Sequence, residues 1–473
     1  MQRDSRQFIA NAEEALQDTQ LQTALTRAKS GFIDKRRKAI ELVDDFELMK
    51  RKAQEAKRRA LSDLPNLLHR FEENLKANGG RVYRAGTAEQ LNRVVLDICA
   101  RHDAKIVTKG KSMVSEETQL NTALEQAGLD VIETDLGEYI IQLAHEPPSH
   151  IIAPAVHKTR QDVAKLFQQH HALGQRSLDE ISALVEEARH MLRRRFLAAD
   201  VGITGANLLV ADTGSVAIVT NEGNGDLTAT LPRVHIVTTS IEKIVTNLED
   251  AGAVLDVLAR SATGQAMSTY TTFLSGPKQQ GDPDGPEEMH VILLDNGRSG
   301  MLDSEYADML RCIRCGACLN HCPVYASVGG HAYGWVYPGP MGSVLTPLMT
   351  GMEQGHVLPN ASTFCGRCAE VCPMGIPLPD LLRRLRGEEH KRKQDSLGWR
   401  LGLRLYSWIA THPRLYHSLM GMISHCLYLL RSRDRSRVRL PILNGWTKQR
   451  EFPAPQQPTT FMQQWHRQRK DSQ

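Results

Sequence analysis

Apolar and charged positions follow a helical spacing through the first 75 residues. Ile33, Ile40 and Val43 would lie on one face of a helix that also contains the charged run Lys35–Lys38. Apolar residues that return every three or four positions mark the buried face of a helix. Residues 1–75 are therefore predicted to form a helical arm that packs on the rest of the chain. No aromatic residues interleave with the charges, so a nucleic-acid contact is not expected.

A different pattern runs from residue 76 to residue 300, where short apolar runs alternate with helical patterns. The predicted strands are 80–84, 105–108, 130–134, 207–211, 215–220, 234–238 and 290–294. The predicted helices are 88–100, 116–127, 159–169 and 178–198. Strands that alternate with helices in this way form a parallel sheet covered by helices. The segment 76–300 is therefore predicted to be an α/β domain.

The last part of the chain is basic. Apolar helical patterns cover 401–410 and 415–430 and are separated by Pro413, which cannot continue a helix. Residues 381–473 contain 19 Lys and Arg against 6 Asp and Glu, a net charge of +13, which leaves −9 on the rest. The segment 391–473 is predicted to be a basic helical region with a poorly ordered tail. Its charge suits a solvated surface, an acidic partner or anionic membrane lipids.

Composition narrows the class of protein. The chain has 473 residues, 41% hydrophobic and 24% charged, as expected for a globular protein with more than one domain. The N-terminus does not resemble a secretory signal, and no run of 18 apolar residues predicts a membrane span. We therefore expect a cytoplasmic protein, or one peripheral to the inner face of the membrane. Thiols stay reduced there, and clustered thiols favour metal over disulfides.

Seven of the nine cysteines fall between residues 312 and 372, within the segment 301–390. The first run has the pattern C-x2-C-x2-C-x3-C-P, formed by Cys312, Cys315, Cys318, Cys322 and Pro323. Three thiolates at successive two-residue gaps can hold one iron–sulfur cluster from a single turn. In two-cluster proteins the fourth cysteine binds the other cluster. This run therefore predicts an iron–sulfur centre.

The second run is shorter by one cysteine. Cys365, Cys368 and Cys372 match the last three cysteines of the first run, and Ser362 takes the place of the first cysteine. Crossed ligation then predicts two sets of ligands. The first cluster would bind Cys312, Cys315, Cys318 and Cys372, and the second Cys322, Cys365 and Cys368, with Ser362 as a candidate fourth ligand.

The two centres differ in what they can hold. The first should be a complete 4Fe-4S cluster, whereas the second could be 4Fe-4S with a non-cysteine ligand, or 3Fe-4S. An open iron in the second could also act as a Lewis acid on a substrate. Zinc is the alternative metal, but zinc sites use pairs of cysteines rather than three successive ones. Arg314 and Arg367 are expected to offset the negative charge of the thiolates.

Other candidate residues are weaker. The loop Lys109–Ser112 could hold an anion, or could be an ordinary turn in which Ser112 or Ser115 caps a helix. Glu222 follows a predicted strand, where ligands of α/β sheets tend to bind. His145, His150 and His157 fit no single helix face, and Cys99 and Cys426 are expected in the core. The sequence identifies no catalytic residue.

Several short motifs of the α/β segment resemble the lactate utilisation (LUD) domain. They are Gly202–Asn207, Ala211–Ser215, Thr220–Asn224, Thr108–Ser112 with Glu116 and Glu117, Ile241–Lys243, and Asp295–Arg298. Followed by two ferredoxin-type cysteine runs and a basic tail, these motifs resemble the lactate utilisation protein B family over roughly residues 30–450. That family also has seven cysteines in these runs, so Ser362 fits its pattern.

The resemblance implies a fold and a role. The fold would be an α/β LUD domain similar to ribose-phosphate isomerases and CoA transferases, followed by an α-helical dicluster ferredoxin-type domain. The role would be electron transfer in a complex that oxidises L-lactate to pyruvate. Two partners are implied, one with its own cysteine-rich motifs and the other a shorter LUD protein. The alternatives are an active site in this LUD domain, a quinone-linked oxidoreductase for another 2-hydroxy acid such as glycolate, and a zinc-stabilised interaction protein.

Overall fold

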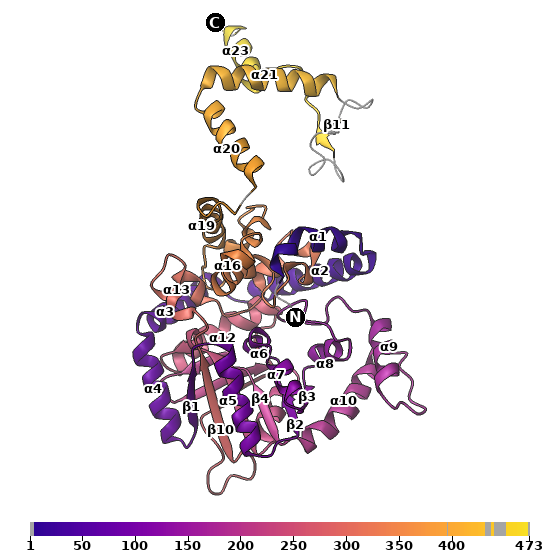
Figure 1. The fold of residues 1–473 in the computed structure, drawn as a ribbon, viewed down its shortest axis with the longest axis vertical. Helices are drawn as coiled ribbons and strands as arrows, with labels where there is room; N and C mark the ends of the chain where they lie inside the picture. The colour runs from indigo at the N-terminus through magenta and orange to yellow at the C-terminus, as the bar shows by residue number, and fades with distance from the viewer. Residues whose placement is uncertain (1–3, 395, 431–436, 439–450, 472–473) are drawn as a thin grey trace. The chain divides into compact units, whose positions relative to one another are not determined.

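The computed structural model describes residues 4–394, 396–430, 437–438 and 451–471 (Figure 1). The chain divides into two compact units, Met1–Glu389 and His390–Gln473. The first unit contains the α/β fold and all seven clustered cysteines. The second contains most of the basic C-terminal segment. The fold is mixed α/β with a parallel sheet, as the sequence predicts.

The N-terminal arm is a series of helices: α1 (Phe8–Gln17), α2 (Thr19–Glu41), α3 (Phe46–Ser62) and α4 (Leu64–Ala77). Asp18 begins α2 by accepting a hydrogen bond from the backbone N–H of Leu21. Such a cap satisfies a donor that the helix itself cannot pair. Short polar residues such as Asp18 therefore determine where a helix of this arm begins. The apolar side of the arm determines how it packs on the rest of the chain.

The arm holds the cysteine segment against the α/β fold. Helix α3 packs on α12 (Leu248–Ala262) of the α/β part. The Gln22 amide on α2 donates to the carbonyl of Ser327 at 2.7 Å, and the Gln54 amide on α3 donates to that of Pro373 at 3.0 Å. The arm thus contacts both parts at once.

A six-stranded parallel sheet forms the centre of the α/β part, in the order β1-β10-β7-β4-β2-β3. Its strands are β1 (Arg81–Ala85), β2 (Ile106–Lys109), β3 (Asp130–Glu133), β4 (Val201–Thr204), β7 (Val234–Ser240) and β10 (Glu288–Leu294). Every residue of β7 is buried, as expected for a central strand covered on both faces. Helices α4, α5 (Ala88–Arg101) and α10 (Ile181–Ala198) contact the sheet (Figure 1).

A second, four-stranded sheet lies beside it in the order β8-β5-β6-β9. Its strands are β5 (Leu208–Val210), β6 (Ser215–Thr220), β8 (Ile244–Val245) and β9 (Tyr270–Leu274). The pairs β5–β6 and β6–β9 are antiparallel, and β5–β8 is parallel. The runs 207–211 and 215–220, predicted as strands, therefore belong to a different sheet from the others.

One predicted helix is divided. The run 116–127 forms α6 (Met113–Thr118) and α7 (Leu120–Gln126). Gln119 between them has φ of 55°, in the left-handed region that a continuous helix does not use. The remaining helices of the α/β part are α8 (Leu136–Leu143), α9 (Arg160–His170) and α11 (Asn224–Thr230).

The core of the first unit is continuous across its parts. Phe46 of the arm, Val254 of α12, Tyr333 and Leu381 of the cysteine-bearing segment belong to one cluster of buried apolar side chains. Shared burial of this kind stabilises the cysteine segment on the α/β fold without a separate core. The cysteine-bearing segment therefore packs directly on the α/β part.

The second unit contains α20 (Leu397–Ala410), α21 (Pro413–Leu429), a short antiparallel pair of β11 (Arg437–Val438) with β12 (Phe452–Pro453), and α23 (Phe461–Asp471). Helices α20 and α21 pack on one another and bury no residue completely. The sequence predicts a poorly ordered tail, whereas its described part includes helix α23. No helix among the described residues is both long and apolar enough to cross a bilayer.

Candidate metal centre

The two cysteine runs have the same backbone conformation. Arg314 and Gly316 have φ of 58° and 73°, and Phe364 and Gly366, fifty positions later, have φ of 53° and 81°. A short helix follows this turn within each run, α14 (Ala317–Asn320) and α18 (Arg367–Glu370). Two left-handed residues around one cysteine curl the chain into a tight loop, and glycine adopts that conformation without strain. The structure therefore repeats a cysteine-bearing loop, as the spacing predicts.

Four cysteines surround one apolar cavity. Cys312, Cys315 and Cys318 of the first run line it together with Cys372 of the second, and the other walls include Met309, Met341 and Ile376. Cys372 thus lies with the first run and not with its own. This grouping is the one that crossed ligation requires for the first centre.

Burial keeps the thiols of this group protonated unless a cation compensates the charge of the thiolates. Burial raises the pKa of the Cys315 thiol to about 12, and Cys372 adds to the shift. Burial, together with Cys312 and Cys315, also raises the pKa of Cys318 well above its usual value. Metal ligands must be thiolates, and buried thiolates side by side repel one another. A cationic iron centre removes that cost, so the donor set fits an iron–sulfur cluster.

The other three cysteines form a second group nearer the surface. Burial raises the pKa of Cys368 to about 12, and the neighbouring Cys322 and Cys365 also raise it. Cys365 itself is exposed, and the backbone N–H of Arg367 lowers its pKa. Ser362 accepts a hydrogen bond on Oγ from the N–H of Phe364 at 3.1 Å. The second group therefore offers three thiolates, one of them open to solvent.

A buried ion-pair network joins the first centre to the α/β part. Arg298 binds Glu117 (Nη2 to Oε2, 2.7 Å) and Glu242 (Nε to Oε2, 2.9 Å). Glu242 also faces Arg314, with Oε1 3.5 Å from Nη2, and Tyr337 donates to Glu117 at 2.8 Å. Burial alone would raise the pKa of Glu242, but Arg298 and Arg314 overcome it and lower that pKa to about 2. The network fixes Arg314 beside Cys312.

The two arginines of the cysteine runs play different roles. Burial disfavours the charge of Arg314, but Cys312, Tyr337 and Glu242 more than compensate, so its pKa is raised. Its guanidinium lies 4.9 Å from the centre of the Tyr337 ring. Arg367 instead pairs with Glu370 at the surface. Arg314 is therefore placed to offset thiolate charge in the interior.

The weaker sequence candidates have separate local roles, although Lys111, Ser112 and Glu222 line one cavity of the α/β part. Ser112 caps α6 by accepting from the N–H of Ser115, the ordinary turn that the sequence allowed. Lys109 is buried and pairs with Glu133 at 2.8 Å and Glu116 at 3.1 Å, so it does not face an open anion site. Glu222 is partly buried, and burial with nearby Asp135 raises its pKa.

The histidines 145, 150 and 157 form no common site. His150 pairs with Asn320 at 2.9 Å, while His157 contacts Ser149 and Glu146 at 2.8 and 2.7 Å. Cys99 is buried as predicted, but the prediction for Cys426 is wrong, since it is exposed. Helix α21, which carries Cys426, buries no residue, so its apolar pattern does not mark a core position.

Sequence reasoning missed the network and one lysine. Lys57 on α3 is buried and donates to the carbonyls of Glu242 and Ile244. It lies in a charged helix where nothing distinguishes it from exposed neighbours. Nothing in the sequence around Tyr337 indicates its role in the network either. Only the resemblance to the LUD motifs singled out Glu117, Glu242 and Arg298.

Comparison with known proteins identifies the parts in order along the chain. Residues 68–294 match the LUD domain, residues 308–376 the 4Fe-4S dicluster domain, and residues 382–471 the C-terminal domain of lactate utilisation protein B. Lactate utilization protein B of Shouchella clausii is 41% identical over 450 residues, covering 95% of this chain and 94% of its own. The chain belongs to the lactate utilisation protein B family.

Other relatives agree. Lactate utilization protein B of a Geobacillus strain is 40% identical over 457 residues and 96% of each chain. A solved DUF162 family protein of Deinococcus radiodurans covers 49% of this chain and 98% of its own, with 15% identity and a TM-score of 0.28, too low to support an argument. As a family member with a 4Fe-4S dicluster domain, the chain is an iron–sulfur protein with a role in lactate utilisation and electron transfer.

Proposed function

We propose that this chain is the electron-transfer subunit of a complex that oxidises L-lactate to pyruvate. The observation that carries the proposal is the arrangement of the cysteines in a member of this family. One group of four lines an internal cavity and has no exposed member, whereas the other group reaches the surface at Cys365. A centre inside the protein followed by a centre with an exposed ligand suits a path for electrons between the interior and a partner.

We further propose that both centres hold iron–sulfur clusters of the 4Fe-4S type. Cys312, Cys315, Cys318 and Cys372 would bind the first, and Cys322, Cys365 and Cys368 the second. Ser362 would supply a fourth ligand to the second, which without it would be a 4Fe-4S cluster with one open iron or a 3Fe-4S cluster. When bound, these clusters accept and release single electrons. The protein contributes burial of the first centre and a fixed arginine, Arg314, that offsets its negative charge.

The partners we propose are two further lactate-utilisation proteins, one with cysteine-rich motifs of its own and one shorter LUD protein. Lactate oxidation releases two electrons, and a subunit with two one-electron centres needs both a donor and an acceptor. The exposed side of the second centre, at Cys365, is the surface we propose for the acceptor.

Gene deletion tests the substrate. Removing the gene should abolish growth on L-lactate as sole carbon source, in a strain without a second lactate route, while growth on glucose stays normal. Expression of the intact gene should restore growth. A strain that loses growth on glycolate but keeps it on L-lactate would instead assign the subunit to another 2-hydroxy-acid oxidoreductase.

We also propose that helices α20 and α21 attach the protein to the cytoplasmic face of an anionic membrane. Residues 396–430 contain three arginines and no acidic residue. Twelve large apolar side chains there are exposed: Leu397, Trp399, Leu401, Leu403, Leu405, Tyr406, Trp408, Leu415, Met422, Ile423, Leu429 and Leu430. Arg400 and Arg404 share one face of α20, four residues apart. Helices that carry basic residues together with exposed Trp and Leu side chains bind at lipid interfaces.

Vesicle sedimentation tests the attachment. The cluster-loaded protein should bind vesicles that contain phosphatidylglycerol, and bind less to phosphatidylcholine alone or in high salt. Replacing both Trp399 and Trp408 by Ser should weaken binding by about tenfold or more, because each buried aromatic contributes about 1.5–3 kcal/mol. Tyr270→Ser, an exposed aromatic of the first unit, is the control. Absence of vesicle binding would contradict the membrane attachment and indicate that a protein partner covers these helices.

A further inference from the structure

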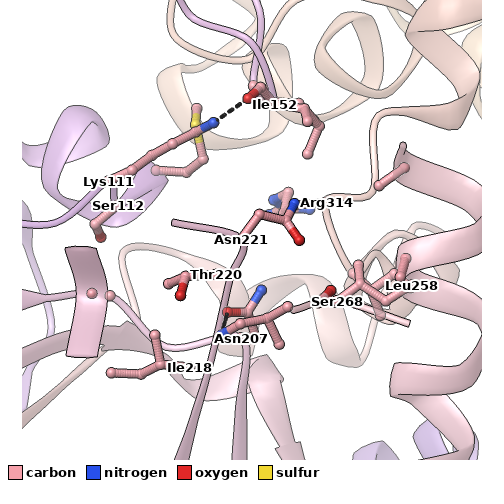
Figure 2. Close-up of a pocket in the computed structure, with 18 of the residues that line it drawn as sticks. Lys111, Ser112, Ile152, Asn207, Ile218, Thr220, Asn221, Leu258, Ser268 and Arg314 are labelled. Carbon is pink, nitrogen blue, oxygen red and sulfur yellow. Dashed lines mark hydrogen bonds between the residues drawn. The ribbon is translucent and has the colours of Figure 1, made fainter. Parts of the chain in front are cut away.

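A cavity of about 420 Å³ lies in the LUD domain beside the first cysteine centre (Figure 2). Its walls come from the residues that follow β2 and β4, from the end of β6 and from α12. Ligands of α/β sheets bind at the carboxyl ends of strands, and small-molecule sites measure about 300–1,000 Å³. Cys312 and Arg314 form part of the wall. A ligand in the cavity would therefore touch the loop that carries the first centre.

The charged side chains of the wall favour an anion. Four are cationic, and two, Asp135 and Glu222, are acidic. Two of the cations are held by neutral carbonyls: Lys111 donates to Ile152 at 2.5 Å and Lys243 to Ala206 at 2.6 Å. A carbonyl orients an ammonium group without neutralising it. The cavity thus keeps positive charge that the protein itself compensates only in part.

Two further cations lie on the side of the cysteine loop. Lys57 also donates to backbone carbonyls, those of Glu242 and Ile244. Arg314 pairs with Glu242 through Nη2, but its Nη1 is buried and has no hydrogen-bond partner among the described residues. A buried guanidinium nitrogen without a partner is costly, and guanidinium groups pair best with carboxylates. This nitrogen is the candidate partner for the carboxylate of a ligand.

Neutral groups complete the lining. Asn207 accepts a hydrogen bond on Oδ1 from the N–H of Val219 at 2.9 Å, which leaves its amide N–H₂ to donate. Asn207, Thr220 and Ser268 lie around the same hollow as Lys111 and Arg314, and Ile218 and Leu258 supply apolar surface (Figure 2). An amide donor suits a hydroxyl or carbonyl oxygen next to a carboxylate. The apolar wall suits a short hydrocarbon chain.

We infer that this cavity binds a small organic carboxylate of the 2-hydroxy or 2-oxo acid class against the loop of the first cysteine centre. The inference rests on the proposed function, because it places the substrate or product of that reaction within this chain. It gives the LUD domain a role as the carboxylate-binding part of the protein. The cations of the wall orient the ligand, and the buried centre adjoins it.

Titration calorimetry on the full, cluster-loaded chain tests the inference with L-lactate and pyruvate as probes and acetate as the comparison. At least one probe should bind saturably and more tightly than acetate, which lacks the oxygen at carbon 2. Lys111→Met should weaken binding by at least about tenfold, because hydrogen bonds to charged groups are the stronger ones. Lys165→Met, on the exposed surface of α9, is the matched control and should leave binding unchanged.

A second variant and a second readout keep the test independent of folding. Asn207→Leu, checked for intact iron content, should also weaken binding, and pyruvate should alter the EPR signal of the reduced first centre in the parent chain. Absence of saturable binding, or binding that both variants leave unchanged, would overturn the inference. Lactate-driven activity that survives both variants in the purified complex would also overturn it, while the electron-transfer function would stand.

Discussion

Replacing Cys315 by Ala should remove the first iron–sulfur centre and reduce lactate-driven dye reduction by the purified complex to background. Cys315 is itself buried and is one of four cysteines around one cavity, so its replacement by Ala leaves three thiolates and no side-chain oxygen in its place. Iron and acid-labile sulfide per chain should fall by about half, because the first 4Fe-4S centre loses one of its four protein ligands. The measurement is metal analysis with EPR of the reduced protein.

Two other cysteines provide the controls for this substitution. Cys99→Ala and Cys426→Ser each remove one thiol outside the cysteine runs, one buried and one exposed. Both variants should keep the iron content and the EPR signals of the parent. Parent-like iron in Cys315→Ala would contradict the ligand assignment. Loss of iron in Cys426→Ser would show that the described grouping of thiols is incomplete.

Arg298→Met should destabilise the first unit by about 3–5 kcal/mol, because it leaves Glu117 and Glu242 buried without their main cationic partner. The Arg298 side chain is 1% exposed and contacts both carboxylates within 3 Å. The midpoint of thermal unfolding should fall by about 4–6 °C. Circular dichroism on the cluster-loaded protein measures this shift.

A surface ion pair is the matched control for Arg298. Arg233 pairs with Glu287 at 3.0 Å, and the two side chains are 77% and 44% exposed. Arg233→Met should change stability by less than about 1 kcal/mol. Adding Glu117→Gln to Arg298→Met should recover part of the loss, since it removes one of the stranded charges. Equal effects of Arg298→Met and Arg233→Met would contradict the role of the buried network.

The loop formed by each cysteine run could be predicted from the sequence, because the spacing of ligands is a local property. The fifty-residue offset between the two runs predicts a repeated loop, and Gly316 and Gly366 occupy equivalent left-handed positions in it. The proximity of Cys372 to the first run is a contact between residues far apart in the sequence. It could be predicted only because crossed ligation is a rule of two-cluster proteins.

Strands were predictable where apolar runs are long and not where they are short. Strand β4 has four residues, one of them Gly202, and its pattern alone does not separate a strand from a turn. Gly202 is required there because a Cβ would lie 1.8 Å from the carbonyl oxygen of Thr228. Strand β9 is half exposed and alternates weakly. The division into two sheets depends on pairing that no local pattern encodes.

Charged residues were the least predictable, because a sequence does not show whether a charge is buried. Lys57 and Arg298 are among the largest fully buried side chains, although lysine and arginine are usually exposed. The opposite error concerns the C-terminal helices. Their apolar spacing suggests a core, yet Cys426 and most apolar side chains of α20 are exposed. A helical apolar pattern predicts a buried face only where a partner covers it.

The central claim is that this chain carries electrons from lactate through two iron–sulfur centres, and lactate-driven reduction tests it most directly. The purified complex, prepared without oxygen, would be mixed with L-lactate and followed by EPR together with iron, sulfide and zinc analysis. We expect iron and sulfide in the chain, and EPR signals of reduced clusters that appear with L-lactate and are changed by the loss of the first centre in Cys315→Ala. Stoichiometric zinc without iron, or clusters that L-lactate leaves oxidised while dithionite reduces them, would contradict the claim.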